Sequence, residues 1–180
     1  LNSLIADQSF SFITSMTPYQ QLLHSFSSVQ NEFKSQHEDA CNFAIGIVPA
    51  FTDFMKPPEG TLFMVQPVQG QMQKVNEVQQ AVFLRPDMHW GMIIGLQILE
   101  EKDKPMQTIL VNIMFHKHES GEYEIHTEAN DDVFIVNDSS LASLTPFFQD
   151  LLKDILLGME QQSDSLGNTE SVKMRRIGFK

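Results

Sequence analysis

The sequence predicts an α+β fold, in which an antiparallel sheet of about five or six strands is packed by one helix near the start of the chain and another near its end. Two observations predict this class. Short segments with strand-like composition follow one another through the middle of the chain, with turn residues between them. Two apolar segments with helical spacing, each opened by a Thr-Pro pair, lie on either side of that series.

The first helix is predicted over about residues 18–36. Thr17 is a favourable N-cap, and Pro18 occupies the first helical position, where its missing N–H costs nothing. Residues 1–16, which precede this helix, have no clean periodicity, and their structure is left open. Large apolar side chains recur at helical spacing along the predicted helix: Tyr19, Leu22, Leu23, Phe26, Val29 and Phe33.

Residues 40–55 fit two structures. Ala44 and Ile47 belong to an apolar series with helical spacing, whereas residues 45–48, which end at Pro49, fit a short strand. The longer helical series favours a helix, and a strand is the alternative.

The middle of the chain predicts a meander of strands. Residues 89–101 are apolar on both faces, as expected of a central strand that is covered on both sides. Residues 69–80 are polar and predict a connection or a short helix. The strand candidates are residues 61–68, 81–86, 89–101, 106–118, 123–128 and 132–137.

A second Thr-Pro pair, Thr145-Pro146, predicts the start of the closing helix, which extends to about Gln161. Its apolar stripe covers more than half of the helix circumference. Either the stripe lies between the sheet and the first helix, or part of it contacts a second copy or another protein. Residues 1–162 therefore form a single predicted domain, and residues 163–180 a flexible tail with a basic tip.

Composition narrows the class of partner and the compartment. The formal net charge of −11 repels phosphate backbones, so we expect no nucleic-acid ligand, and it favours basic partners. Cys41 is the only cysteine, which excludes an intrachain disulfide and indicates a reducing, cytoplasmic compartment. No apolar run approaches the ~20 residues that span a bilayer, so we expect no membrane insertion.

The segment 115–128 contains three candidate metal ligands, His116, His118 and His126, among several glutamates. Its two strands can pair in three registers, and a slip of one residue exchanges the faces of a whole strand. A three-residue loop closed by Gly121 in the left-handed region gives one clean apolar face, so we expect that register. The opposite face then carries all three histidines.

A shared face is necessary for a metal site but not sufficient. Neighbours two apart on one strand are ~7 Å apart, whereas zinc requires ligand atoms about 2.0–2.1 Å from one point. The alternative is a solvated face on which histidines and carboxylates pair across the strands. A metal site using these histidines predicts tight retention of zinc or manganese, lost on the substitution His118→Ala.

Two further groups could carry chemistry. His37 and Cys41 share a face if residues 40–55 are helical, as a nucleophile would require, although a cysteine in apolar surroundings is more often a small core residue. Arg85, Asp87 and His89 lie in a turn and could line a pocket, although they could equally satisfy the turn itself, with Trp90 in the core. No common catalytic motif occurs in the sequence.

In outline, the chain resembles the small acidic chaperones and adaptors of bacterial secretion systems over about residues 17–161. The resemblance rests on charge, size and the order of helices and strands. It implies a protein that holds segments of effector or coupling proteins without hydrolysing nucleotide. We expect no cofactor.

The predicted function is a non-enzymatic protein-binding module of the adaptor or chaperone kind. Its acidic body would attract a basic or amphipathic segment of a partner, and an apolar surface would bury that segment. Two alternatives stay open: a metal-binding protein or enzyme that uses the histidine face, and a self-associating homodimeric subunit. The predicted apolar contacts are Phe148, Leu152, Leu156 and Met159.

Overall fold

The structure is a computed structural model that describes residues 16–101, 104–128, 132–163 and 174–177. It divides into two compact units, Leu1–Asp39 and Ala40–Lys180. The division falls inside a helix, and the domain predicted over residues 1–162 spans the whole first unit and residues 40–162 of the second.

Helix α2 (Pro18–Met55) begins where the sequence predicts. Thr17 and Gln20 form a capping box, because the Gln20 backbone N–H donates to Thr17 Oγ1 (3.3 Å) and the Thr17 N–H donates to Gln20 Oε1 (2.9 Å). The predicted helix over residues 18–36 and the ambiguous residues 40–55 are one continuous helix, since no glycine or proline separates them. Lys56, with φ of +48°, ends the helix in the left-handed conformation.

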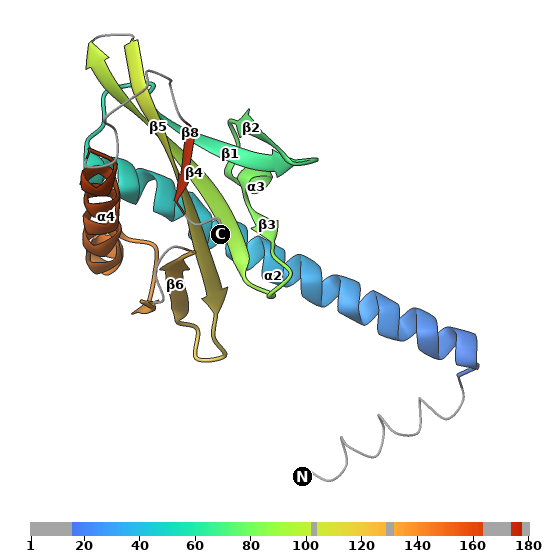
Figure 1. Cartoon of the computed structure of the whole chain (residues 1–180). Helices are drawn as coiled ribbons and strands as arrows, with labels where there is room; N and C mark the ends of the chain where they lie inside the picture. Colours follow the sequence, from blue (N-terminus) through green and yellow to red (C-terminus); the bar gives the residue numbers. More distant parts are fainter. Residues whose placement is uncertain (1–15, 102–103, 129–131, 164–173, 178–180) are drawn as a thin grey trace. The chain divides into compact units, whose positions relative to one another are not determined.

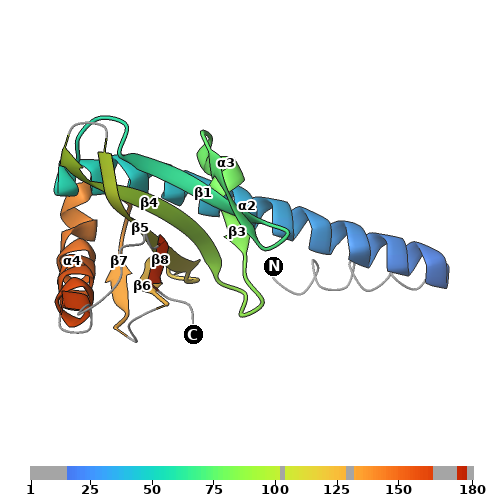
Figure 2. The same cartoon turned by 45° about the horizontal axis from the view of Figure 1, so that its top comes forward.

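Within the part of the chain that the structure describes, the sheet has eight strands. Six follow the order β2-β1-β4-β5-β6-β7, while β3 also pairs with β4 and β8 also pairs with β5; Figure 1 and Figure 2 show this arrangement. The run from β4 to β7 is the predicted meander, and the α+β class is confirmed. The strands are β1 (Leu62–Val68), β2 (Gln71–Val75), β3 (Phe83–Leu84), β4 (Trp90–Glu101), β5 (Lys104–Lys117), β6 (Tyr123–Thr127), β7 (Phe134–Val136) and β8 (Met174–Ile177).

The polar residues 69–80 differ from their prediction as a connection or short helix. They contain strand β2, which pairs with β1, followed by the short helix α3 (Val78–Ala81). Gln69 and Gly70 both have positive φ, +49° and +80°, as a two-residue turn that matches the twist of a hairpin requires. The Gln69-Gly70 pair was therefore a sequence signal for a hairpin, although it lies within a polar segment.

Helix α4 (Leu141–Ser163) begins earlier than Thr145-Pro146, where the sequence predicted its start. Ser140 caps it, because its Oγ accepts a hydrogen bond from the Ser143 N–H (3.3 Å). Pro146 is tolerated in the second turn, where the carbonyl that loses its partner belongs to the exposed residue Ala142. Among the described residues, no helix is long and apolar enough to cross a membrane.

The main core of the second unit lies between one face of the sheet, here called the helix face, and two helical segments. Residues 40–55 of α2 and helix α4 pack there against alternate residues of the strands, including Ile113, Phe115 and Ile125. The opposite face, here called the outer face, has a smaller apolar cluster around Val65, Ile93 and Leu110. Strand β4 is thus covered on both faces, as its sequence predicts.

Four residues of the predicted flexible tail lie in strand β8. This strand pairs in parallel with β5, with Thr108 opposite Met174 and Val111 opposite Ile177. Ser163, the first residue of that predicted tail, is the last residue of α4, and residues 164–173 and 178–180 lie outside the described residues.

Candidate functional site

The hairpin of β5 and β6 has the predicted register. Phe115 lies opposite Ile125, and Lys117 lies opposite Tyr123. Gly121 has a φ of +91° and donates its backbone N–H to the His118 carbonyl (2.9 Å), which closes the three-residue loop. Phe115 and Ile125 belong to the helix face. Because successive side chains of a strand point to opposite faces, the histidines of the hairpin lie on the outer face.

A second turn brings His89 to the same face. The hairpin of β3 and β4 is closed by a hydrogen bond from the Arg85 N–H to the His89 carbonyl (2.9 Å). Asp87 Oδ1 accepts a hydrogen bond from the His89 N–H (3.1 Å), and Met88 has a φ of +67°. The histidines of residues 115–128 and the turn at residues 85–89 are separate in the sequence, but they belong to one site in the structure.

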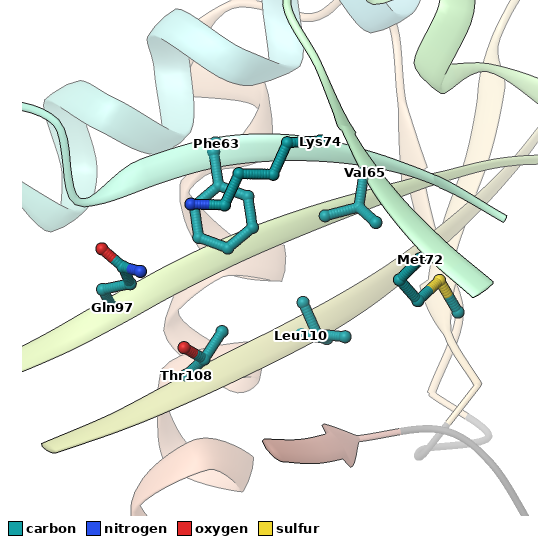
Figure 3. A pocket seen from close by; sticks show the side chains of 7 residues that line it. All are labelled: Phe63, Val65, Met72, Lys74, Gln97, Thr108 and Leu110. Carbon is teal, nitrogen blue, oxygen red and sulfur yellow. The ribbon is translucent and has the colours of Figure 1, made fainter. Parts of the chain in front are cut away.

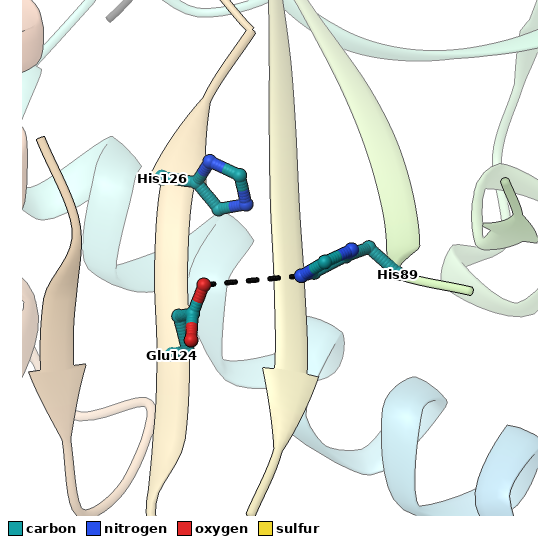
Figure 4. A group of neighbouring side chains, drawn as sticks. All are labelled: His89, Glu124 and His126. Carbon is teal, nitrogen blue, oxygen red and sulfur yellow. Dashed lines mark ion pairs between the residues drawn. The ribbon is translucent and has the colours of Figure 1, made fainter. Parts of the chain in front are cut away.

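His89, Glu124 and His126 form the centre of this site. Each offers one ligand atom, and these three atoms lie within 4.8 Å of one another. Figure 4 shows the three side chains pointing toward one another, from β6 and from the residue that precedes β4. His89 Nε2 lies 3.8 Å from Glu124 Oε1.

The other two histidines of the hairpin lie at the edge of this group. His118 Nε2 is 3.4 Å from Glu124 Oε2, so it contacts the carboxylate oxygen that does not face His89. The ring of His116 packs edge-on against the rings of His89 (centroids 5.6 Å apart) and His118 (5.7 Å). Of the predicted set His116, His118 and His126, only His126 is in the converging group.

Charged and polar residues support the site from one side. The Arg85 guanidinium donates to Asp87 Oδ2 (3.2 Å) and to Glu128 Oε1 (3.0 Å), and the Asn112 amide donates to Glu128 Oε2 (2.9 Å). Burial opposes the charge on Arg85, but the hydrogen bonds and negative charges of Glu128 and Asp87 outweigh it and raise the pKa of Arg85. Partial burial opposes the charge on Asp87, but the hydrogen bond from the His89 N–H and the hydrogen bond and positive charge of Arg85 outweigh it and lower the pKa of Asp87.

Three buried atoms of the site have no hydrogen-bond partner: His89 Nδ1, Asn112 Oδ1 and His126 Nε2. Asp87 Oδ1 lies 3.6 Å from His89 Nδ1, which is beyond hydrogen-bonding distance. Burial, followed by the charge of His89, lowers the pKa of His126, which favours its neutral imidazole. A neutral imidazole nitrogen can accept a proton or bind a metal ion.

Trp90, from the turn, and Cys41, from α2, are core residues. Trp90 is buried in the main core, as expected for the start of a central strand. Cys41 is also buried, and burial raises the pKa of its thiol. A nucleophilic cysteine requires a lowered pKa, so the structure favours the core role for Cys41.

The four predicted contact residues of α4 lie at different depths. Phe148 is 0% exposed and packs edge-on against Phe51, so it belongs to the core. Leu152 and Met159 are half-buried, and Met159 packs against the core. Leu156 is 52% exposed, so it is the one of the four that a partner could contact most fully.

A pocket of about 160 Å³ lies on the outer face, between strands β1, β2, β4 and β5 (Figure 3). The Lys74 ammonium lies over the Phe63 ring, 3.8 Å from its centroid, at one side of the pocket. Gly95 leaves room for that ring, because a side chain at this position would meet it. The other lining residues are Val65, Met72, Gln97, Thr108 and Leu110.

Sequence reasoning missed one exposed surface in the first unit. Tyr19, Leu22, Phe26, Val29 and Phe33 follow one another at intervals of three and four residues along α2, and their side chains are between 47% (Phe33) and 73% (Tyr19) exposed. We call these five residues the α2 seam. Their 3-4 spacing, which is that of a coiled-coil interface, was present in the sequence, but spacing alone does not show that the side chains are exposed.

No protein-family model matches the chain, and comparison with curated proteins and with solved structures finds no similar one.

Proposed function

We propose that the chain is a non-enzymatic protein-binding module whose binding element is the α2 seam, and that the seam binds the same seam of a second copy. The observation that carries this proposal is the exposure of five large apolar side chains at coiled-coil spacing on one helix. Burying one such side chain contributes roughly 1.5–3 kcal/mol relative to leaving it in water.

The lack of packing around the first part of α2 supports the presence of a partner. Within the described part of the first unit, no residue is buried. Most helical stability in proteins comes from packing of an apolar face. Pairing of two seams would supply the missing packing.

The distribution of charge favours a second copy over a basic partner at the seam. Between Pro18 and His37, the only Asp, Glu, Lys or Arg residues are Glu32 and Lys34, whose formal charges cancel. The net charge of −11 therefore lies elsewhere in the chain. Two copies of this segment would meet without like-charge repulsion, whereas a basic partner would gain no attraction from it.

A dimer formed in this way leaves the acidic second unit free to hold a basic or amphipathic segment, with exposed Leu156 among the apolar contacts. This arrangement agrees with the adaptor or chaperone role that the sequence predicts. The resemblance to secretion chaperones stays a prediction.

The proposal is tested by light scattering after size-exclusion chromatography on the full chain and two variants. Phe26→Glu places a charge in the seam, and Asn31→Glu places the same charge on the opposite side of the same helix. We expect wild type and Asn31→Glu to be dimers. We expect Phe26→Glu to be monomeric, with a dissociation constant raised at least ~100-fold, because two apolar contacts are lost per dimer.

Thermal unfolding of the second unit serves as the control for folding, because Phe26 and Asn31 lie outside it. Equal dimerisation of all three proteins would contradict the role of the seam. A monomeric wild-type chain would contradict the second copy as its occupant.

A further inference from the structure

The outer face of the sheet holds a ligand set that the proposed function does not use. We propose that His89, Glu124 and His126 bind one divalent transition-metal ion of the zinc class. The proposal rests on the convergence of their ligand atoms within 4.8 Å and does not depend on dimerisation.

The chemistry of the donors selects the class of ion. Two imidazoles and one carboxylate suit zinc and its first-row neighbours, whereas magnesium and calcium prefer a shell of oxygen atoms. A three-residue set leaves at least one coordination position open, as in zinc sites that bind water or a further ligand.

The distances require a small closure of the site. Ligand atoms about 2.0–2.1 Å from a tetrahedral zinc ion lie roughly 3.3 Å from one another. His89 and Glu124 have side chains that are 29% and 23% exposed, so both can move without disturbing the core. Glu124 and His126 lie in strand β6, whose pairing with β5 fixes their backbone positions.

The unpartnered nitrogen of His126 is a second and independent indication of a ligand. A buried polar atom without a hydrogen bond has lost its contact with water without a replacement, and His126 Nε2 is such an atom. A bound cation would replace that contact.

Neighbouring residues are placed to orient the ligands. His118 Nε2 contacts Glu124 Oε2 and leaves Oε1 toward His89. Asp87 Oδ1 lies 3.6 Å from His89 Nδ1, and a small shift of His89 on metal binding would let it accept the hydrogen bond by which carboxylates orient metal-binding histidines. The positive charge of Arg85 would oppose a cation, but Asp87 and Glu128 both pair with it.

The test is a zinc titration of the untagged full chain after removal of metal with a chelator. A competing chromophoric chelator reports the affinity, and elemental analysis reports the stoichiometry. We expect one zinc ion per chain, and an increase in the melting temperature when zinc is added. His89→Asn, Glu124→Gln and His126→Asn should each raise the zinc dissociation constant at least ~100-fold and abolish that increase.

Two further variants separate the ligands from their surroundings. His24→Asn removes an exposed histidine of the first unit and should leave the zinc affinity unchanged. His118→Asn should weaken binding by about 10-fold to 100-fold, as loss of an orienting residue does. Thermal unfolding without zinc shows whether each variant is folded.

Three results would overturn the proposal. The first is the absence of stoichiometric zinc from the folded wild-type chain. The second is loss of zinc from His118→Asn or a His116→Asn variant with full retention by His89→Asn, which would return the site to the hairpin alone. The third is an equal loss from His24→Asn, which would indicate non-specific binding to histidines.

Discussion

Cys41 is the residue whose structural position most directly predicts its chemistry. Its side chain is buried in the main core, and burial raises the pKa of its thiol. Since the thiolate is the reactive form, we expect Cys41 to react with a thiol reagent far more slowly in the folded chain than in urea. The rate of colour release from an aromatic disulfide reagent measures this. Equal rates in the two states would contradict the assigned burial.

The metal-site residues show how far single residues can be interpreted from sequence. Hydrophobic alternation fixes the face of His116, His118 and His126, because only one register separates apolar from polar side chains. Alternation cannot show that His89, from another hairpin, lies beside His126, because that contact depends on the pairing of β4 with β5. The face of the sheet could therefore be predicted from the sequence, whereas the set of ligands could be identified only from the structure.

At the scale of the element, the loop of the β5–β6 hairpin depends on Gly121. Its φ of +91° lies in the region that residues with a side chain adopt at a cost. We expect Gly121→Ala to lower the free energy of unfolding by about 1–2 kcal/mol, as measured by urea denaturation. Glu119→Ala, at an exposed neighbouring position, should change it by less than about 0.5 kcal/mol. Equal effects would contradict the loop conformation.

Helix α4 contains both core and surface residues among its predicted partner contacts. We expect Phe148→Ala to lower the free energy of unfolding by about 3–5 kcal/mol, because Phe148 is wholly buried. Leu156→Ala should change it by less than about 0.5 kcal/mol, because half of Leu156 is exposed. Urea denaturation followed by circular dichroism gives both values. A similar loss in the two variants would show that Leu156 is also covered.

Element types were more predictable than element boundaries. The capping box at Thr17 and the apolar strands were present in the sequence as local signals. The start of α4 was misplaced because a Thr-Pro pair is a stronger local signal than Ser140, whereas the structure tolerates Pro146 in the second turn. The burial of one face of α4 and the exposure of the α2 seam are tertiary outcomes, which helical spacing alone does not distinguish.

At the scale of the whole molecule, the central claim is that the chain is a dimer through the α2 seam. The first unit has exposed apolar residues in a segment of α2 where the formal charges of Glu32 and Lys34 cancel, and the second unit has a core of its own. Two-fold dimers are the commonest homo-oligomers, and pairing of identical seams would cover this surface.

The most direct test is sedimentation equilibrium of the full wild-type chain over a wide range of concentration. The account predicts a mass that approaches twice the 20.5 kDa of one chain as concentration rises. A mass of one chain at every concentration would contradict it.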